Sequence, residues 1–97
     1  MILLKVHKNG NSEVVSLCDS NLIGKTFEEG RLHIEVLEKF YKGKELPKEK
    51  ILLILKNCSN ANIVGKESIN LALDNKLIEK GSIVKIKKVP ISYLIRI

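Results

Sequence analysis

The chain has 97 residues, 44% of them hydrophobic and 4% aromatic, with a formal net charge of +6. This length and composition predict one globular domain over residues 1–97 with a modest aliphatic core, and they exclude a disordered or multidomain protein. The longest apolar run covers residues 51–55 and is too short to span a membrane, so no membrane partner is expected.

The positive charge is carried almost entirely by lysine, because Arg31 and Arg96 are the only arginines. A basic chain favours an anionic partner such as RNA. Nucleic-acid sites usually employ arginine for its planar fork and its stacking, whereas lysine serves as a point charge for phosphate. The dominance of lysine therefore weakens the case for nucleic acid without removing it.

Cys18 and Cys58 are the only cysteines, and they lie far apart in the sequence. No secretory signal precedes them, because residues 1–4 lack a charged start and an adequate apolar run. We therefore expect two reduced, unligated thiols in the cytoplasm. His7 and His33 would complete four zinc ligands by number alone, without the paired spacing of zinc sites, so no metal and no cofactor are predicted.

Residues 2–8 and 13–18 alternate between apolar and polar side chains, a pattern typical of strands with one buried face. Asn9-Gly10 lies between them and is a strong signal for a two-residue hairpin turn. That turn would place Leu4 opposite Val15, with the apolar side chains of both strands on one side of the sheet. His7 falls on the other side, where we expect it to be solvated.

A third strand with a polar outer face is predicted over residues 31–36. Before it, Gly24-Lys25-Thr26 resembles the end of a phosphate-binding loop, but that motif requires glycine where Asp19 stands, so we reject it. After it, Phe40 and Tyr41 lie among lysines and could stack on a base. The favoured interpretation places Phe40 in the core and Tyr41 at its edge with a solvated hydroxyl.

Two amphipathic segments, residues 47–57 and 64–76, predict helices, and Pro47 suits the first position of the first helix. Residues 82–89 and 91–97 predict the last two strands, with Pro90 between them at an edge or a corner. The expected fold is α+β: a mainly antiparallel sheet of about five strands with both helices packed on one face.

The joint between the two helices, residues 57–66, is the most compact cluster of small polar residues in the chain. Asn60 and Asn62 are predicted as alternative N-caps of the second helix. The free N–H groups at the start of that helix would face an anion, which Gly65 and Lys66 would help to hold. The simpler alternative, helix capping without any ligand, is the commoner arrangement.

Lys25 and Thr26 are further candidates for anion or partner binding, in addition to the residues of segment 57–66. We expect the segments 24–26 and 60–66 to lie near each other on one surface and to form a partly basic polar concavity. Tyr41, Lys42, Lys85 and Lys87 are secondary candidates. No pair of acids and no nucleophile with its base occurs at a diagnostic spacing, so no catalytic residue is predicted.

Two groups of short motifs resemble the archaeal domain-of-unknown-function family 424, whose members are small proteins of about this length. The motifs are Cys18-Asp19, Leu22-Ile23-Gly24-Lys25-Thr26-Phe27, Glu29-Gly30-Arg31-Leu32 and Phe40-Tyr41 with Gly43, followed by Ala61-Asn62-Ile63-Val64-Gly65 and Ala72. Lys44 departs from the pattern, which has glutamate directly after the glycine. The resemblance implies an archaeal cytoplasmic protein associated with translation, and it supplies no catalytic residue.

Three functions are weighed on these observations. The first is a small basic, non-enzymatic accessory protein that binds RNA or a ribonucleoprotein through a surface lined with lysine and asparagine. The second is a module that docks another protein through the sheet edge after Pro90, without nucleic acid. The third is an enzyme that acts on a phosphate-bearing substrate with Asn62, Thr26 or Asp19 in a cleft. The sequence does not determine the oligomeric state.

Overall fold

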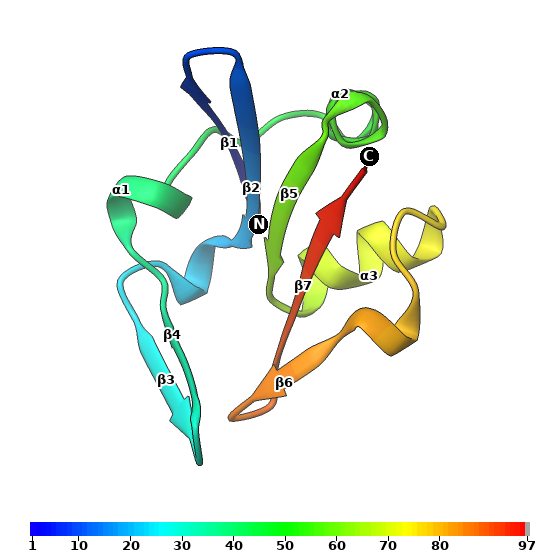
Figure 1. The fold of residues 1–97 in the computed structure, drawn as a ribbon. Helices are drawn as coiled ribbons and strands as arrows, with labels where there is room; N and C mark the ends of the chain where they lie inside the picture. Colours follow the sequence, from blue (N-terminus) through cyan, green and yellow to red (C-terminus); the bar gives the residue numbers. More distant parts are fainter. Residues whose placement is uncertain (97) are drawn as a thin grey trace.

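A five-stranded sheet with the strand order β1-β2-β5-β7-β6 organises the chain, as the computed structural model of residues 1–96 shows (Figure 1). The β2–β5 pair is parallel and the other three pairs are antiparallel, so the sheet is mixed but mainly antiparallel. The predicted α+β class is confirmed. The strands of this sheet are β1 (Ile2–Asn9), β2 (Ser12–Asp19), β5 (Asn60–Val64), β6 (Val84–Ile86) and β7 (Val89–Ile95).

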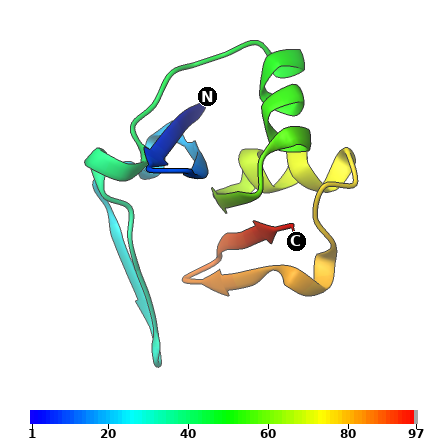
Figure 2. The same cartoon turned by 45° about the horizontal axis from the view of Figure 1, so that its top comes forward.

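Two helices, α2 (Lys48–Asn57) and α3 (Lys66–Asp74), lie on one face of this sheet, as predicted (Figure 2). The main core lies between the helices and the sheet, where the side chains of Leu17, Leu55 and Ile63 are fully buried. These residues come from alternate positions of the strands and from one side of α2, which is the arrangement that the apolar periodicity predicts.

The other face of the sheet is covered at one end by α1 (Glu38–Tyr41) and by a separate two-stranded sheet of β3 (Thr26–Glu29) and β4 (Leu32–Glu35). Cys18 and Val64 are buried there against Val36 and Tyr41. The strand predicted over residues 31–36 therefore exists, but it pairs with β3 outside the main sheet. Tyr93 and Ile95, on the same face of the sheet, are exposed.

β5 corrects the prediction that residues 57–66 form a loop before the second helix. It is an inner strand whose residues pair with β2 on one side and with β7 on the other. Asn60 and Asn62 favour turns locally. Ala61 and Ile63 are buried in the core on the helix side, and this packing, together with pairing on both edges, outweighs the local preference of the asparagines.

The β1–β2 hairpin turns at Gly10-Asn11, one residue later than predicted, so that Leu4 pairs with Leu17 and not with Val15. Gly10 has a φ of 65° at the first turn position, the position at which the type II′ turn requires glycine. The observed pairing of β1 with β2 therefore differs from the predicted pairing by two residues. Each side chain therefore keeps its predicted face of the sheet, and the apolar pattern could not reveal the error.

The strand predicted over residues 82–89 is also divided. β6 ends at Ile86, Lys87 and Lys88 form a tight turn, and Pro90 lies inside β7 opposite Lys85. A 3-10 helix, Lys80–Ser82, precedes β6, and a second one, Ser20–Leu22, follows β2. The prediction for Ile97 lies outside the described residues.

Candidate functional site

The start of α3 is capped by Asp19, which lies at the end of β2 and is 48 residues away from the first N–H that it binds. Asp19 is buried, with 5% of its surface exposed. Its Oδ2 accepts a hydrogen bond from the Glu67 N–H at 3.0 Å, and its Oδ1 accepts two from Ser68, at 2.8 Å from the backbone N–H and 2.7 Å from the hydroxyl. A carboxylate here also complements the positive end of the helix dipole.

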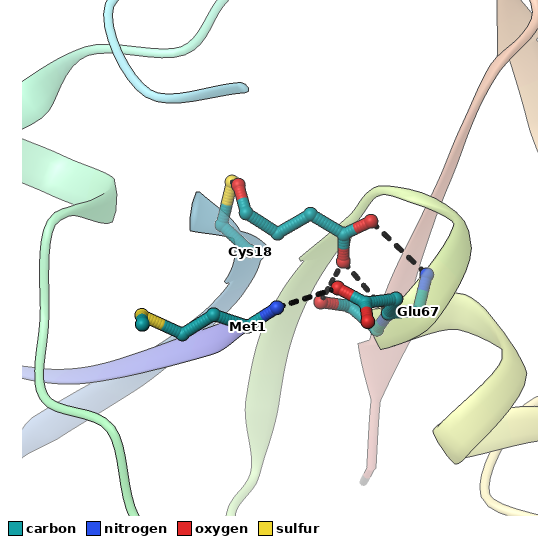
Figure 3. Close-up of polar contacts among 5 residues, drawn as sticks. Met1, Cys18 and Glu67 are labelled. Atoms are coloured by element: carbon teal, nitrogen blue, oxygen red, sulfur yellow. Dashed lines mark hydrogen bonds and ion pairs between the residues drawn. The ribbon is translucent and has the colours of Figure 1, made fainter. Parts of the chain in front are cut away.

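Figure 3 shows these contacts around Glu67, whose carboxylate in turn accepts from the N-terminal amine of Met1 at 2.8 Å. The Glu67 and Ser68 N–H groups at the start of α3 are therefore not free to bind an anion, because Asp19 supplies their acceptor. The N-cap position belongs to Gly65, and neither Asn60 nor Asn62 caps the helix. Asp19 therefore has a structural role as the cap of α3.

Gly65 has a packing role in the same contact. Its φ is 108°, and a Cβ at this position would lie 2.3 Å from Cγ of Asp19. Its N–H donates to the carbonyl of Pro90 at 2.9 Å, which ties the start of α3 to β7. The sequence singled out Gly65 as a contact for a partner, whereas the structure shows that glycine is needed here for the approach of Asp19.

Asn60 and Asn62 lie half-buried on the face of the sheet that α1 partly covers. Tyr41, close to Asn62, is only 6% exposed, and burial raises the pKa of its hydroxyl to about 12 although the amide of Asn62 lowers it in part. A buried ring cannot stack on an external base, so Tyr41 is not a base-binding residue. The predicted roles of the two aromatics are exchanged, because Tyr41 fills the core and Phe40 is half-buried at its edge.

His7 was predicted to be solvated, and it is instead half-buried against Phe40. The two rings stack with their centroids 4.1 Å apart and their planes 10° from parallel. Nε2 of His7 lies 2.8 Å from the carbonyl oxygen of Phe40, and the hydroxyl of Ser16 donates to the same oxygen at 2.9 Å. These contacts hold α1 on the sheet, so His7 has a structural role.

Lys25 and Thr26 are exposed at the base of the β3–β4 hairpin. The backbone of Lys25 is fixed, because its N–H donates to Leu22 and its carbonyl accepts from the N–H of Val36. Lys66 lines two hollows in the surface, which are described below. Lys25 and Thr26 line neither of them. The structure brings Lys66 together with Lys85 rather than with Lys25.

Four lysines surround a concavity of about 480 Å³ between α3 and the segment that leads into the β6–β7 hairpin. We call this site the lysine concavity. Each lysine comes from a different element. Lys66 is the first residue of α3 and Lys80 the first residue of the second 3-10 helix. Lys85 lies in β6, and Lys88 lies in the turn that follows it. The side chains of Ile69, Leu73, Ile83 and Pro90 form its apolar floor, and Asn70 adds an amide.

The β6–β7 pairing explains why Lys85 reaches this site. Lys85 and Pro90 are cross-strand partners, so their side chains lie on the same face of the sheet, the one that carries α3. A second hollow of about 220 Å³ adjoins the first and shares Lys66, Lys88 and Pro90 with it. The smaller hollow lies beside the start of α3 and is also lined by Asp19, whose carboxylate accepts the hydrogen bonds that cap this helix.

The charge of the lysine concavity is not neutralised by the protein. Within residues 1–96, the ion pairs join the N-terminus to Glu67, His33 to Glu28 and Glu35, and Lys42 to Glu38. None of them involves a lysine of the concavity. Four ammonium groups that face one hollow without a carboxylate favour an anionic ligand there.

The turn between β6 and β7 is unusual, because both of its residues are lysines with positive φ. The φ angles are 51° at Lys87 and 68° at Lys88, values that glycine and asparagine adopt far more readily. Each lysine costs about 1 kcal/mol in this conformation. The N–H of Lys87 donates to Oε1 of Glu29 at 2.9 Å, so the tip of the β3–β4 hairpin helps to hold the turn.

Lys66 and Lys85 were among the predicted site residues, whereas Lys80 and Lys88 were not. The turn at Lys88 was not predicted, because residues 82–89 have the pattern of one strand and no glycine or asparagine marks the turn. Lys87, a secondary candidate, is exposed in this turn outside the lining of the concavity. Lys42 lies at the opposite edge of the sheet, where its ammonium is 3.3 Å from Oε1 of Glu38.

The two cysteines are free and buried. Burial, together with the charge of the adjoining Asp19, raises the pKa of the Cys18 thiol to about 12. Burial also raises the pKa of Cys58. Such thiols are poor nucleophiles at neutral pH, since the thiolate is the reactive form. Separately, no helix within residues 1–96 is long and apolar enough to cross a membrane.

The fold and the lysine concavity define a small basic α+β domain with a lysine-lined hollow at one edge of its sheet. The chain belongs to the DUF424 family, described as a protein of unknown function, whose family model matches residues 6–97. This confirms the resemblance that the motifs indicated. A comparison with curated proteins gives no match.

The fold is similar to that in the crystal structure of an uncharacterized conserved protein from Methanopyrus kandleri. The TM-score is 0.76 at 23% sequence identity, and the likeness covers 99% of this chain and 93% of the other. At this level of identity the comparison establishes a shared fold.

Proposed function

We propose that this protein is a small cytoplasmic accessory protein that binds RNA, alone or within a ribonucleoprotein, and that the lysine concavity contacts the phosphates. The observation that carries the proposal is the convergence of four lysines without a carboxylate partner on one hollow. An association with translation fits such a role, and it comes from the family resemblance and not from the geometry.

Lysine is suited to this task in spite of the scarcity of arginine. Contacts to phosphate position a protein on RNA and carry little sequence information, and an ammonium group on a flexible stem satisfies them. The release of counterions from the RNA then supplies much of the affinity. The expected binding mode is therefore dominated by charge and is strongly dependent on salt.

The test is a titration of a short, labelled single-stranded RNA, followed by fluorescence anisotropy at several salt concentrations. A Lys66→Gln/Lys85→Gln variant removes two phosphate contacts and should make the slope of log affinity against log salt less steep by about 1.4. The matched control is Lys44→Gln/Lys50→Gln, which removes the same charge from the opposite edge of the sheet. Equal slopes for the two variants would contradict the proposal.

A second candidate function, the docking of a protein segment, is favoured by the outer edge of β7. β6 pairs only with residues 89–91, so the following part of β7 has no strand beside it within the described residues. The Arg96 N–H and the Pro90 carbonyl form hydrogen bonds on the β5 side of β7. Because the backbone groups of alternate residues point to opposite edges of a strand, the N–H and carbonyl groups of Tyr93 and Ile95 point to the open edge. A groove of about 270 Å³ runs along it.

The side chains at this edge are also available, since 59% of Tyr93 and 71% of Ile95 are exposed. An extended peptide could add here as a further strand. A pull-down from a native-like extract, with and without nuclease, separates the two functions. A partner that is retained after nuclease treatment and in high salt supports docking at β7, whereas loss of the partner under both conditions supports RNA binding.

A further inference from the structure

The lysine concavity combines two chemistries that a simple phosphate-binding stripe does not need. Its rim carries four ammonium groups, whereas its floor is formed by the apolar side chains of Ile69, Leu73, Ile83 and Pro90. Contacts to an RNA backbone require only the charged rim. An apolar floor beside a cationic rim matches a ligand that has a flat, weakly polar ring at one end and a phosphate at the other, as a nucleotide has.

The concentration of charge indicates which phosphate is bound. A phosphodiester carries one negative charge, and successive phosphodiesters are spread along a chain, whereas a terminal phosphate monoester carries between one and a half and two charges on one group at pH 7. Lys66 and Lys88 line both adjoining hollows and therefore face the same small region. A dianionic group matches such a cluster better than an isolated diester does.

The turn conformation of Lys88 offers a way to test the same assignment. Asparagine or glycine would adopt its φ of 68° with less strain, yet a lysine stands there and lines both hollows. Strained residues cluster at sites where a ligand needs their side chains. Lys76 and Lys87 also have positive φ and lie outside the lining of the concavity, so the conformation alone does not mark a binding residue. Lys87 therefore serves as the control for Lys88.

We propose that the lysine concavity binds a 5′-phosphorylated nucleotide, with the terminal phosphate on Lys66 and Lys88 and the base on the floor formed by Ile69 and Leu73. Asn70 can donate to and accept from the edge of the base. This inference rests on the proposed RNA-binding function and specifies which part of the RNA enters the site. The same chemistry occurs in the 5′ end of an RNA and in a free nucleotide.

The first measurement compares two short single-stranded RNAs of identical sequence, one with a 5′-monophosphate and one with a 5′-hydroxyl, by anisotropy of a label at the 3′ end. The wild-type protein should bind the phosphorylated RNA about tenfold more tightly. If the two RNAs bind with equal affinity, this inference is overturned. The RNA-binding proposal still stands in that case, provided that Lys66→Gln/Lys85→Gln reduces the salt dependence of binding. Absence of binding to both RNAs would overturn the two proposals together.

The second measurement uses the two turn lysines. Lys88→Asn keeps a residue that tolerates positive φ and removes the ammonium group, so the variant should fold and lose the preference for the 5′-phosphate. Lys87→Asn should fold equally well and retain the preference, because Lys87 does not line the site. If both variants lose the preference or both retain it, the assignment of the phosphate to Lys88 is wrong.

The third measurement distinguishes the two sources of the ligand. A free nucleoside 5′-monophosphate is added as a competitor to the complex with phosphorylated RNA. Displacement at a concentration similar to that of the RNA identifies the free nucleotide as a sufficient ligand. Displacement only at a much higher concentration shows that the remainder of the RNA contributes, and the ligand is then an RNA end. Failure of the nucleotide to displace the RNA at any concentration would contradict a nucleotide-binding concavity.

Discussion

Two hollows of similar size and similar charge lie at opposite edges of the sheet, and they differ in how their lysines are used. The lysine concavity lies beside β6, and a hollow of about 500 Å³, which we call the β1-edge hollow, lies beside β1. Leu4, Leu46 and Ile54 contribute apolar side chains to the β1-edge hollow. Its four lysines are Lys5, Lys42, Lys44 and Lys50.

Two of the lysines in the β1-edge hollow are already engaged. The ammonium of Lys5 donates to the carbonyl of Lys39, and that of Lys42 pairs with Glu38. The backbone of Lys44 bonds to Leu4 in both directions and so covers part of the free edge of β1. This hollow is a place where the chain closes its own sheet edge. Counts of lysines do not distinguish the two hollows, whereas the contacts of those lysines do.

The largest expected effect comes from removing the cap on which the lysine concavity depends. Asp19→Ala leaves two backbone N–H groups and the Ser68 hydroxyl without their acceptor at the start of α3. The free energy of unfolding should fall by about 3 kcal/mol, as measured by urea denaturation. Asp74→Ala, at the exposed far end of α3, is the control and should change stability little. Equal effects of the two substitutions would show that the cap is dispensable.

The second effect tests whether the β1-edge hollow is only structural. A Cβ at Gly43 would lie 2.0 Å from the carbonyl oxygen of Leu4, so Gly43→Ala should separate the chain from β1 and break the two Leu4–Lys44 hydrogen bonds. We expect a loss of about 2 kcal/mol in the free energy of unfolding. RNA affinity under conditions where the variant is folded should be unchanged.

Gly81→Ala is the control for that substitution, because nothing lies within 4 Å of a Cβ at this position and its φ is not in the left-handed region. Urea denaturation and the anisotropy titration check both variants. If Gly43→Ala weakens RNA binding as strongly as Lys66→Gln/Lys85→Gln does, the division of the two hollows into a binding site and a structural contact fails.

Periodicity was sufficient to predict the elements that bury one face. The alternation in β1 and β2 and the helical spacing of Ile51 and Leu55 placed these segments correctly. β5 was missed because its two asparagines have the composition of a turn, and its strand conformation comes from pairing with β2 and β7. The local turn preference of the asparagines was outweighed by contacts with strands that are distant in the sequence, and a short stretch of sequence gives no information about such contacts.

The site was less predictable than the fold, for the same reason. Lys66 and Lys85 were selected for their charge and their neighbours, but their common hollow depends on the register that sets Lys85 opposite Pro90. The capping of α3 by Asp19 joins residues 48 apart and leaves no local signal. The asparagines at the joint offered a plausible local cap, and a more distant carboxylate with three hydrogen bonds took its place.

The smallest expected effect concerns the strained turn that the lysine concavity has and the β1-edge hollow lacks. Lys87→Asn and Lys88→Asn should each raise the free energy of unfolding by about 0.5 kcal/mol, because asparagine adopts positive φ with less strain and the Lys87 N–H keeps its bond to Glu29. Lys85→Asn, in β6 and without positive φ, is the control and should give no gain. Urea denaturation at a single salt concentration measures all three variants. If Lys88→Asn raises the stability and abolishes the preference for the 5′-phosphate, the chain maintains a strained lysine for binding. If neither substitution raises the stability, the positive φ of these two lysines is not strained.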